Sequence, residues 1–188
     1  WNTTVVNRTG RGDGCPYCSN YKVLVGFNDL KTLFPEIAKE ADGWDPSTVV
    51  AGSSKKMPWK CNKGHLWDAQ IKNRKHGKGC PYCSHNKILS GFNDLKTICP
   101  QLADEADGWD PSTVFPSSNK KMSWKCREGH TWVTSPNQRS TNGCPYCSNY
   151  KVLVGFNDLK TLFPEIAKEA DGWDPSTVVA GSSKKMPW

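Results

Sequence analysis

The residues Trp59-Lys60-Cys61-Asn62-Lys63-Gly64-His65-Leu66-Trp67, followed by Cys80-Pro81-Tyr82-Cys83, decide the fold of this chain. The pattern returns as Trp124-Lys125-Cys126-Arg127-Glu128-Gly129-His130-Thr131-Trp132 and Cys144-Pro145-Tyr146-Cys147. A Cys-x-x-x-His pair followed by Cys-x-x-Cys supplies three thiolates and one imidazole, a set that closes a tetrahedral zinc site without leaving a position for substrate. The spacing therefore predicts two structural zinc sites. Their ligands are Cys61, His65, Cys80 and Cys83, then Cys126, His130, Cys144 and Cys147, while Cys15 and Cys18 form a half-site.

These cysteines fit two other roles less well. Cys-Pro-Tyr-Cys is similar to the glutaredoxin active site, but a redox motif is expected once per chain, within a βαβ unit. A disulfide framework suits a small secreted domain, yet it leaves the histidine at the same place in both sets unexplained. The ninth cysteine, Cys99, stands where the other copies have phenylalanine, so we expect it to pack as a small apolar residue. His76 and His85 have no counterparts and are expected at the surface.

The whole chain is an array of one repeated unit of about 65 residues. Cys-Pro-Tyr-Cys begins at Cys15, Cys80 and Cys144, and residues 15–59 recur unchanged as residues 144–188. The middle copy, residues 80–124, matches them at 31 of 45 positions. We expect two complete zinc repeats, 21–85 and 86–149, between the C-terminal part of one repeat (1–20) and the N-terminal part of another (150–188), as in a window from a longer array.

Each repeat is predicted to be a small α+β module that depends on zinc, because about 65 residues enclose only a thin core. Residues 28–41 have apolar side chains at helical spacing, with Asn28 as the expected N-cap and Pro35 dividing the stretch into two short helices. A short strand near Val49-Val50 and a hairpin around the first cysteine-histidine pair should follow. Trp44, Trp59 and Trp67 are expected to pack around the metal, with exposed base-stacking platforms as the alternative.

Charge is segregated within each repeat. Residues 26–46 contain five acids and two lysines, whereas residues 55–78 contain eight bases and one acid. Regularly spaced basic surfaces are typical of non-specific nucleic-acid binding through phosphates. We therefore expect the chain to bind nucleic acid, with DNA favoured over RNA. The residues expected to make the contacts are Lys55, Lys56, Arg74, Lys75, Lys120, Lys121 and Arg139.

Two alternatives to nucleic-acid binding stay open at this level. Three thiolates on Zn²⁺ leave a net negative charge, so the lysines could simply compensate it and keep a hairpin soluble. A basic and an acidic face in every repeat could also support self-association or contacts between neighbouring repeats, as in a solenoid or filament. Base-specific recognition is not expected, because the sequence contains no helix with exposed Arg, Asn or Gln at the positions that read the major groove.

The sequence also resembles a known family, the tandem zinc-ribbon repeats of treble-clef type from bacteria and viruses. The resemblance rests on Asn-Asp-Leu with a proline and an acidic helix, on Gly-Ser-x-Lys-Lys-x-x-Trp-Lys-Cys-x-x-Gly-His-x-Trp, and on Asn-Arg before Gly-Cys-Pro-Tyr-Cys. It covers essentially the whole chain; the second complete repeat departs at Gln138-Arg139, where the first has Asn73-Arg74. The resemblance implies tandem treble-clef modules, in some proteins joined to nuclease-like domains, with nucleic-acid binding as the expected role.

Several function classes are excluded or disfavoured. No apolar run approaches the ~18 residues of a membrane span, and the first residues resemble no signal peptide. Paired carboxylates, a nucleophile elbow, a phosphate loop and an open metal position are all missing from the motifs, so neither an enzyme nor a small-molecule substrate is expected. Thiolate ligands stay unoxidised in a reducing compartment, which predicts an intracellular, cytoplasmic protein of a bacterium or of a virus-infected host. The formal net charge of +7 permits a polyanionic partner without requiring one.

Overall fold

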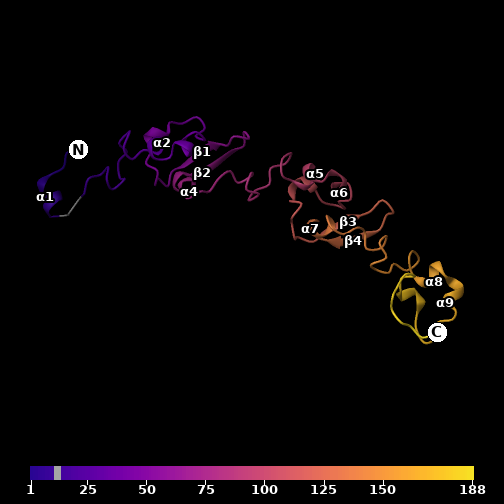
Figure 1. Ribbon diagram of the computed structural model, residues 1–188. Coiled ribbons are helices and arrows are strands. Elements are labelled where there is room, and N and C mark those ends of the chain that lie inside the picture. Colours follow the sequence, from indigo (N-terminus) through magenta and orange to yellow (C-terminus); the bar gives the residue numbers. More distant parts are fainter. Residues whose placement is uncertain (11–13) are drawn as a thin grey trace. The chain divides into compact units, whose positions relative to one another are not determined.

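The computed structural model describes residues 1–10 and 14–188, which form two compact units, Trp1–Lys87 and Ile88–Trp188 (Figure 1). In the first unit the helices and strands are α1 (Val5–Thr9), α2 (Leu30–Leu33), α3 (Pro35–Ala38), β1 (Lys56–Lys60), β2 (Leu66–Gln70) and α4 (Ile71–Lys75). In the second they are α5 (Leu95–Ile98), α6 (Pro100–Ala103), β3 (Met122–Lys125), β4 (Thr131–Thr134), α7 (Pro136–Arg139), α8 (Leu159–Leu162) and α9 (Pro164–Ala167). Each unit contains one pair of strands, and all of its elements are very short.

The two helices that open each repeat are separated by a proline, as predicted. Phe34 has φ −138° and ψ 66°, outside the helical region, because the ring of Pro35 disfavours helical geometry at the residue before it. The predicted cap was wrong by one residue. Asp29, rather than Asn28, caps α2: its carboxylate accepts a hydrogen bond from the backbone N–H of Thr32 at 2.9 Å. A carboxylate at this position also interacts favourably with the positive end of the helix.

Asn28 instead joins the helix pair to the cysteine turn that precedes it. Its amide nitrogen donates to the carbonyls of Tyr17 (2.8 Å) and Lys22 (2.9 Å), and its oxygen accepts from the backbone N–H of Leu24. The side chain is 3% exposed. Asn157 makes the same bonds in the second unit, to Tyr146, Lys151 and Leu153. In each unit this asparagine therefore connects the cysteine turn that ends one repeat to the helix pair of the next.

The hairpin carries the first metal-binding pair. β1 pairs antiparallel with β2, with Trp59 opposite Trp67, and β3 pairs with β4 with Trp124 opposite Trp132. The expected strand near Val50 is only an isolated bridge to Asp29, since the segment turns away after one pair of bonds. The predicted strand after the histidine ends at Gln70, where α4 begins.

Tryptophans and cysteines make up the core of each complete repeat. Trp59 is fully buried and Trp67 is 9% exposed, and the same fractions hold for Trp124 and Trp132. The first core also includes Leu30, Ala51, Cys61, Ile71 and Cys80, and the second includes Leu95 and Cys144. The predicted packing of the tryptophans around the metal ligands is confirmed for these four residues. Cys99 is half-buried against the second core, as expected from its phenylalanine counterparts.

None of the helices within the described residues exceeds five residues, so none could cross a bilayer, which takes about 20 residues in a helix.

Candidate metal centre

The first pair of donors lies on the tight turn of the hairpin. Cys61 follows β1 directly and His65 directly precedes β2. The backbone N–H of Cys61 donates to the carbonyl of His65 at 3.1 Å, and that of Gly64 donates back to Cys61 at 2.8 Å. Gly64 has φ +82°, a conformation that costs a glycine little and a residue with a Cβ considerably more. The turn thus points the thiol and the imidazole toward the same space.

The second pair lies on the turn Cys80-Pro81-Tyr82-Cys83. This turn is closed by Ser84, whose backbone N–H and hydroxyl both donate to the carbonyl of Cys80, at 3.1 and 3.0 Å. The ring of Tyr82 meets the ring of His65 edge-on, with centroids 5.8 Å apart. Tyr82 therefore supports the imidazole from the side of the second turn.

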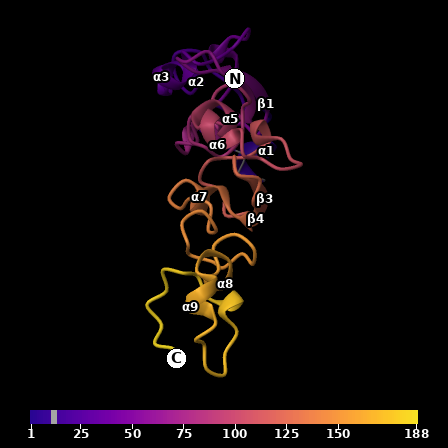
Figure 2. The same ribbon diagram turned by 90° about the vertical axis from the view of Figure 1, so that its right-hand side faces the viewer.

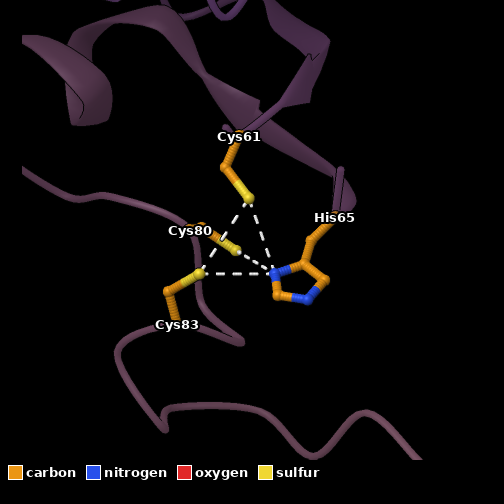
Figure 3. Close-up of side chains that lie close together, drawn as sticks. All are labelled: Cys61, His65, Cys80 and Cys83. Carbon is orange, nitrogen blue, oxygen red and sulfur yellow. Dashed lines mark hydrogen bonds between the residues drawn. The ribbon is translucent and has the colours of Figure 1, made fainter. Parts of the chain in front are cut away.

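The four donor atoms converge in the geometry of a tetrahedral zinc site. His65 Nδ1 lies 3.5, 3.6 and 3.3 Å from the sulfurs of Cys61, Cys80 and Cys83 (Figure 3). The sulfurs of Cys61 and Cys83 are 3.9 Å apart. Zinc–sulfur bonds of about 2.3 Å and zinc–nitrogen bonds of about 2.0 Å give tetrahedral edges of roughly 3.5–3.8 Å, so the donors fit zinc closely.

The second complete repeat has the same arrangement. His130 Nδ1 lies 3.6, 3.7 and 3.3 Å from the sulfurs of Cys126, Cys144 and Cys147. In both clusters all four donor atoms lie within 4.8 Å of one another. The two predicted zinc sites are thus confirmed as Cys3His clusters that fit structural zinc, in which the metal cross-links the hairpin to the second turn.

In each cluster the pKa of one thiol is lowered and that of another is raised. Burial alone would raise the pKa of Cys61, but backbone N–H donors at Lys63 and His65 outweigh it and lower that pKa. Burial, together with the neighbouring thiols, raises the pKa of Cys83 to about 11. In the second cluster the pKa of Cys147 is raised to about 12 for the same reasons. Without a cation, three thiolates at this distance repel one another, so a divalent metal is what allows all three to ionise together.

Cys15 and Cys18 repeat the second turn but have no partner pair within the described residues. The backbone N–H of Ser19 donates to the carbonyl of Cys15 at 3.0 Å, as in the complete sites. Cys15 is half-buried and Cys18 is exposed. This turn is a possible half-site, which fits the prediction made from the sequence.

Two of the seven residues predicted to contact nucleic acid lie inside their repeats. The guanidinium of Arg74 is ion-paired with Glu40 and lies 5.1 Å from the ring centre of Trp59 and 5.2 Å from that of Trp67. Only 5% of Arg74 is exposed. Arg139 binds Glu105 in the same way, at 2.6–2.8 Å. Each arginine thus fixes the helix after the hairpin to the acidic end of the helix pair.

Sequence reasoning missed this ion pair, although a signal for it existed. The glutamate and the arginine are 34 residues apart in both repeats, and both tryptophans that flank the arginine recur at fixed spacing. An ion pair that holds the two halves of a repeat together keeps its acid and its base at the same separation in every copy. That constant separation is visible in the sequence.

The five predicted lysines lie at the surface. Lys55 and Lys56, and likewise Lys120 and Lys121, are exposed at the start of each hairpin. Lys75 is exposed on α4, with its ammonium 5.9 Å from the ring centre of Phe34. Lys56 has one loose ion pair, 3.7 Å from Asp68. The loop before the hairpin is bonded to the start of α4 through Lys72 N–H and the carbonyl of Ser53 (2.9 Å) and through Ile71 N–H and the carbonyl of Lys55 (3.2 Å), so Lys55 lies next to that helix.

Comparison with known proteins agrees with this geometry. A family model described as "Probable Treble clef zinc finger domain" matches residues 34–86 and 98–150, which include both complete Cys3His clusters. A search of curated proteins found no match.

Proposed function

The chain belongs to the family described as the Probable Treble clef zinc finger domain, and from this premise we propose that it is a non-catalytic tandem zinc module that binds nucleic acid, DNA in preference to RNA, through phosphate contacts. Each zinc site has four protein ligands, so the metal has no open position for a substrate or an activated water. That closed ligand set supports a binding role over a catalytic one. Neither the family match nor the described part of the structure indicates a solenoid.

One observation carries the proposal: each complete repeat presents a pair of exposed lysines on a loop that is fastened to the helix behind it. In the first repeat this loop is held by Lys72 N–H to Ser53, and in the second by Asn137 N–H to the carbonyl of Ser118 at 3.1 Å. A fixed backbone lets exposed ammonium groups meet phosphates with less loss of conformational entropy. Two such surfaces on one chain add their contacts along a polyanion.

The lysines, and not the arginines, form the proposed surface. Arg74 and Arg139 already use their guanidinium groups inside the repeat, so replacing them would test folding rather than binding. The first repeat should contribute more affinity than the second. Its helix α4 has Lys72 and Lys75, where the second repeat has Asn137 on α7 and Ser140 directly after it.

The thiolate ligands also bear on the compartment. Zinc-bound cysteines are lost to oxidation where disulfides form, so a reducing environment inside a cell favours the folded module.

The test is a salt-dependent binding titration with charge-matched variants. The variant Lys55→Glu/Lys56→Glu should bind a random DNA duplex more weakly, and its salt slope should fall by about 2. The control Lys31→Glu/Lys96→Glu changes the net charge by the same amount on α2 and α5 and should bind like the parent chain. Zinc content is measured in parallel for each variant. Equal losses for both variants would mean that binding follows net charge alone and would overturn the assigned surface.

A further inference from the structure

The second unit contains a groove that the zinc site does not use. Its volume is about 650 Å³, and it lies between strand β4, the segment after α7 and the residues that follow Cys147. Its lining includes Trp132, Lys121, Lys151 and the highly exposed Tyr150. Its polar residues also include Gln138, Asn142, Thr134, Thr141 and Ser148.

The charge of this groove differs from that of a second groove in the same repeat. Two lysines and no aspartate or glutamate line the first groove, among the residues that the structure describes. The second groove is lined by three acids and three bases, namely Asp104, Glu105, Asp107, Lys125, Arg127 and Arg139. The first groove therefore has a net positive charge that attracts an anion, whereas the charges of the second balance.

Tyr150 stands on backbone that is anchored on both sides. Its side chain is 83% exposed. The next residue, Lys151, donates its N–H to the carbonyl of Pro145 at 2.8 Å and accepts from Asn157 at 2.9 Å. The residue before it, Asn149, adopts the left-handed conformation with φ 57° and bonds to the same Asn157. An aromatic ring in water on a fixed backbone is a preorganised stacking surface.

We propose that this groove takes an unpaired nucleotide of a single-stranded nucleic acid, with its base stacked on Tyr150 and its flanking phosphates on Lys121 and Lys151. The inference rests on the proposed function and adds a second mode of contact to it. Stacking on an aromatic ring requires a base that is not paired, so the groove gives a preference for single strands or open ends over duplex. The amides of Gln138 and Asn142 lie where they could meet the edge of that base.

The chain contains its own controls. Tyr21 has the same neighbours in sequence as Tyr150 and is equally exposed, at 84%. In the part of the chain that the structure describes, however, no strand pair precedes Tyr21, so it lacks a counterpart of Lys121, which leads into β3, and of the β4 residues that line the groove. The corresponding position of the first complete repeat is Asn86, which offers no ring.

The experiment measures binding of a labelled single-stranded 12-mer, and of the duplex of the same sequence, to the zinc-loaded chain. Tyr150→Ala should weaken single-strand binding about ten-fold and leave duplex binding unchanged, because one stacked base is lost. Tyr150→Phe keeps the ring and should bind like the parent chain. Tyr21→Ala should leave both affinities unchanged. All three changes replace a highly exposed side chain, and zinc content verifies that each variant is folded.

The outcomes separate this inference from the proposed function. Unchanged single-strand affinity in Tyr150→Ala, with duplex binding intact, would overturn the groove and leave phosphate binding standing. Equal losses in Tyr21→Ala and Tyr150→Ala would show that an exposed tyrosine suffices without the groove, which would also overturn it. No binding of either nucleic acid by the parent chain would overturn both proposals.

Discussion

Residues 15–59 and 144–188 have identical sequences, and the structure places them in different surroundings. Much of their local structure is the same. The indole N–H of Trp44 donates to the carbonyl of Pro58 at 2.7 Å, and that of Trp173 donates to Pro187 at 2.6 Å. Both copies have the divided helix pair and the buried asparagine bonded to the preceding turn. These features need only residues close in sequence.

The copies differ at side chains whose packing partners come from later in the chain. Trp59 is in β1 and fully buried, whereas Trp188 is 57% exposed and the segment before it forms no strand (Figure 2). Phe163 and Ile166 are 48% and 45% exposed, while Phe34 and Ile37 are half-buried against the first core. The first copy is followed by β2, by α4 with its arginine and by the metal ligands. Those elements turn a locally ordered segment into a packed module.

The comparison assigns a role to each part of the repeat. The helix caps, the proline between the helices and the asparagine joint (Asn28 with its bonds to the preceding turn) set the path of the chain. The hydrogen bonds of the cap and of the joint connect residues that are 3 to 11 positions apart. The Glu40–Arg74 ion pair and the metal cluster join residues up to 34 and 22 positions apart, and together with the strand pair they supply the burial. Removing the second group from the first copy should therefore make it behave like the second copy.

Removal of zinc should have the largest effect. Structural zinc contributes about 10–16 kcal/mol in small modules, so a chelator should unfold both complete repeats. With 5-fluorotryptophan in the chain, the fluorine resonances of Trp59, Trp67, Trp124 and Trp132 should move to solvent-exposed shifts. The resonance of Trp188, which is already exposed, should change little. Retention of the buried resonances without metal would contradict the account.

Loss of the buried ion pair should come next. Glu40→Gln leaves the guanidinium of Arg74 buried without its counter-charge, which should destabilise the first repeat by about 3 kcal/mol. Chemical denaturation followed through the same tryptophan resonances measures this. The control is Glu169→Gln in the identical sequence: within the described residues its carboxylate has no arginine partner, so stability should not change. Equal effects would mean that Glu40 acts through its helix rather than through the pair.

The asparagine joint should matter equally in both copies. Asn28→Ala and Asn157→Ala each remove the hydrogen bonds of a buried side chain to the preceding turn, so each should cost about 1–3 kcal/mol locally. Hydrogen exchange of the amides of Leu24 and Leu153, which donate to these side chains, measures the loss. A large effect in only one copy would show that the joint depends on the complete zinc site and is not a local device.

The smallest effect concerns the helix caps. Burial alone would raise the pKa of Asp29 and Asp158, but hydrogen bonds from Thr32 and Gly26, or from Thr161 and Gly155, outweigh it and lower both pKa values. A lowered pKa stabilises the fold above the usual aspartate range, and this contribution is lost as the pH falls through the folded value. Carboxyl carbon titration by NMR should give both aspartates the same value, below about 3.9. A normal value for either would contradict the capping bonds.

The features that short sequence motifs determine could be predicted from the sequence. The contact between Glu40 and Arg74, which are far apart in sequence, could not. The metal ligands and the proline between the helices follow from spacing and backbone sterics, so they were predicted correctly. The cap was assigned to Asn28 because asparagine and aspartate are equally good caps, and only the bonds to the preceding turn distinguish them. Arg74 was grouped with the surface lysines because charge alone does not reveal a partner 34 residues away.

The most direct test of the account is the number of zinc ions held by the folded chain, measured by native mass spectrometry. Two complete Cys3His clusters predict two ions per chain. Cys83→Ser and Cys147→Ser should each remove one ion, while Cys18→Ser should remove none. A third ion held as tightly as the other two, or loss of an ion from the Cys18→Ser variant, would contradict the assignment of the metal to the two Cys3His clusters found among the described residues.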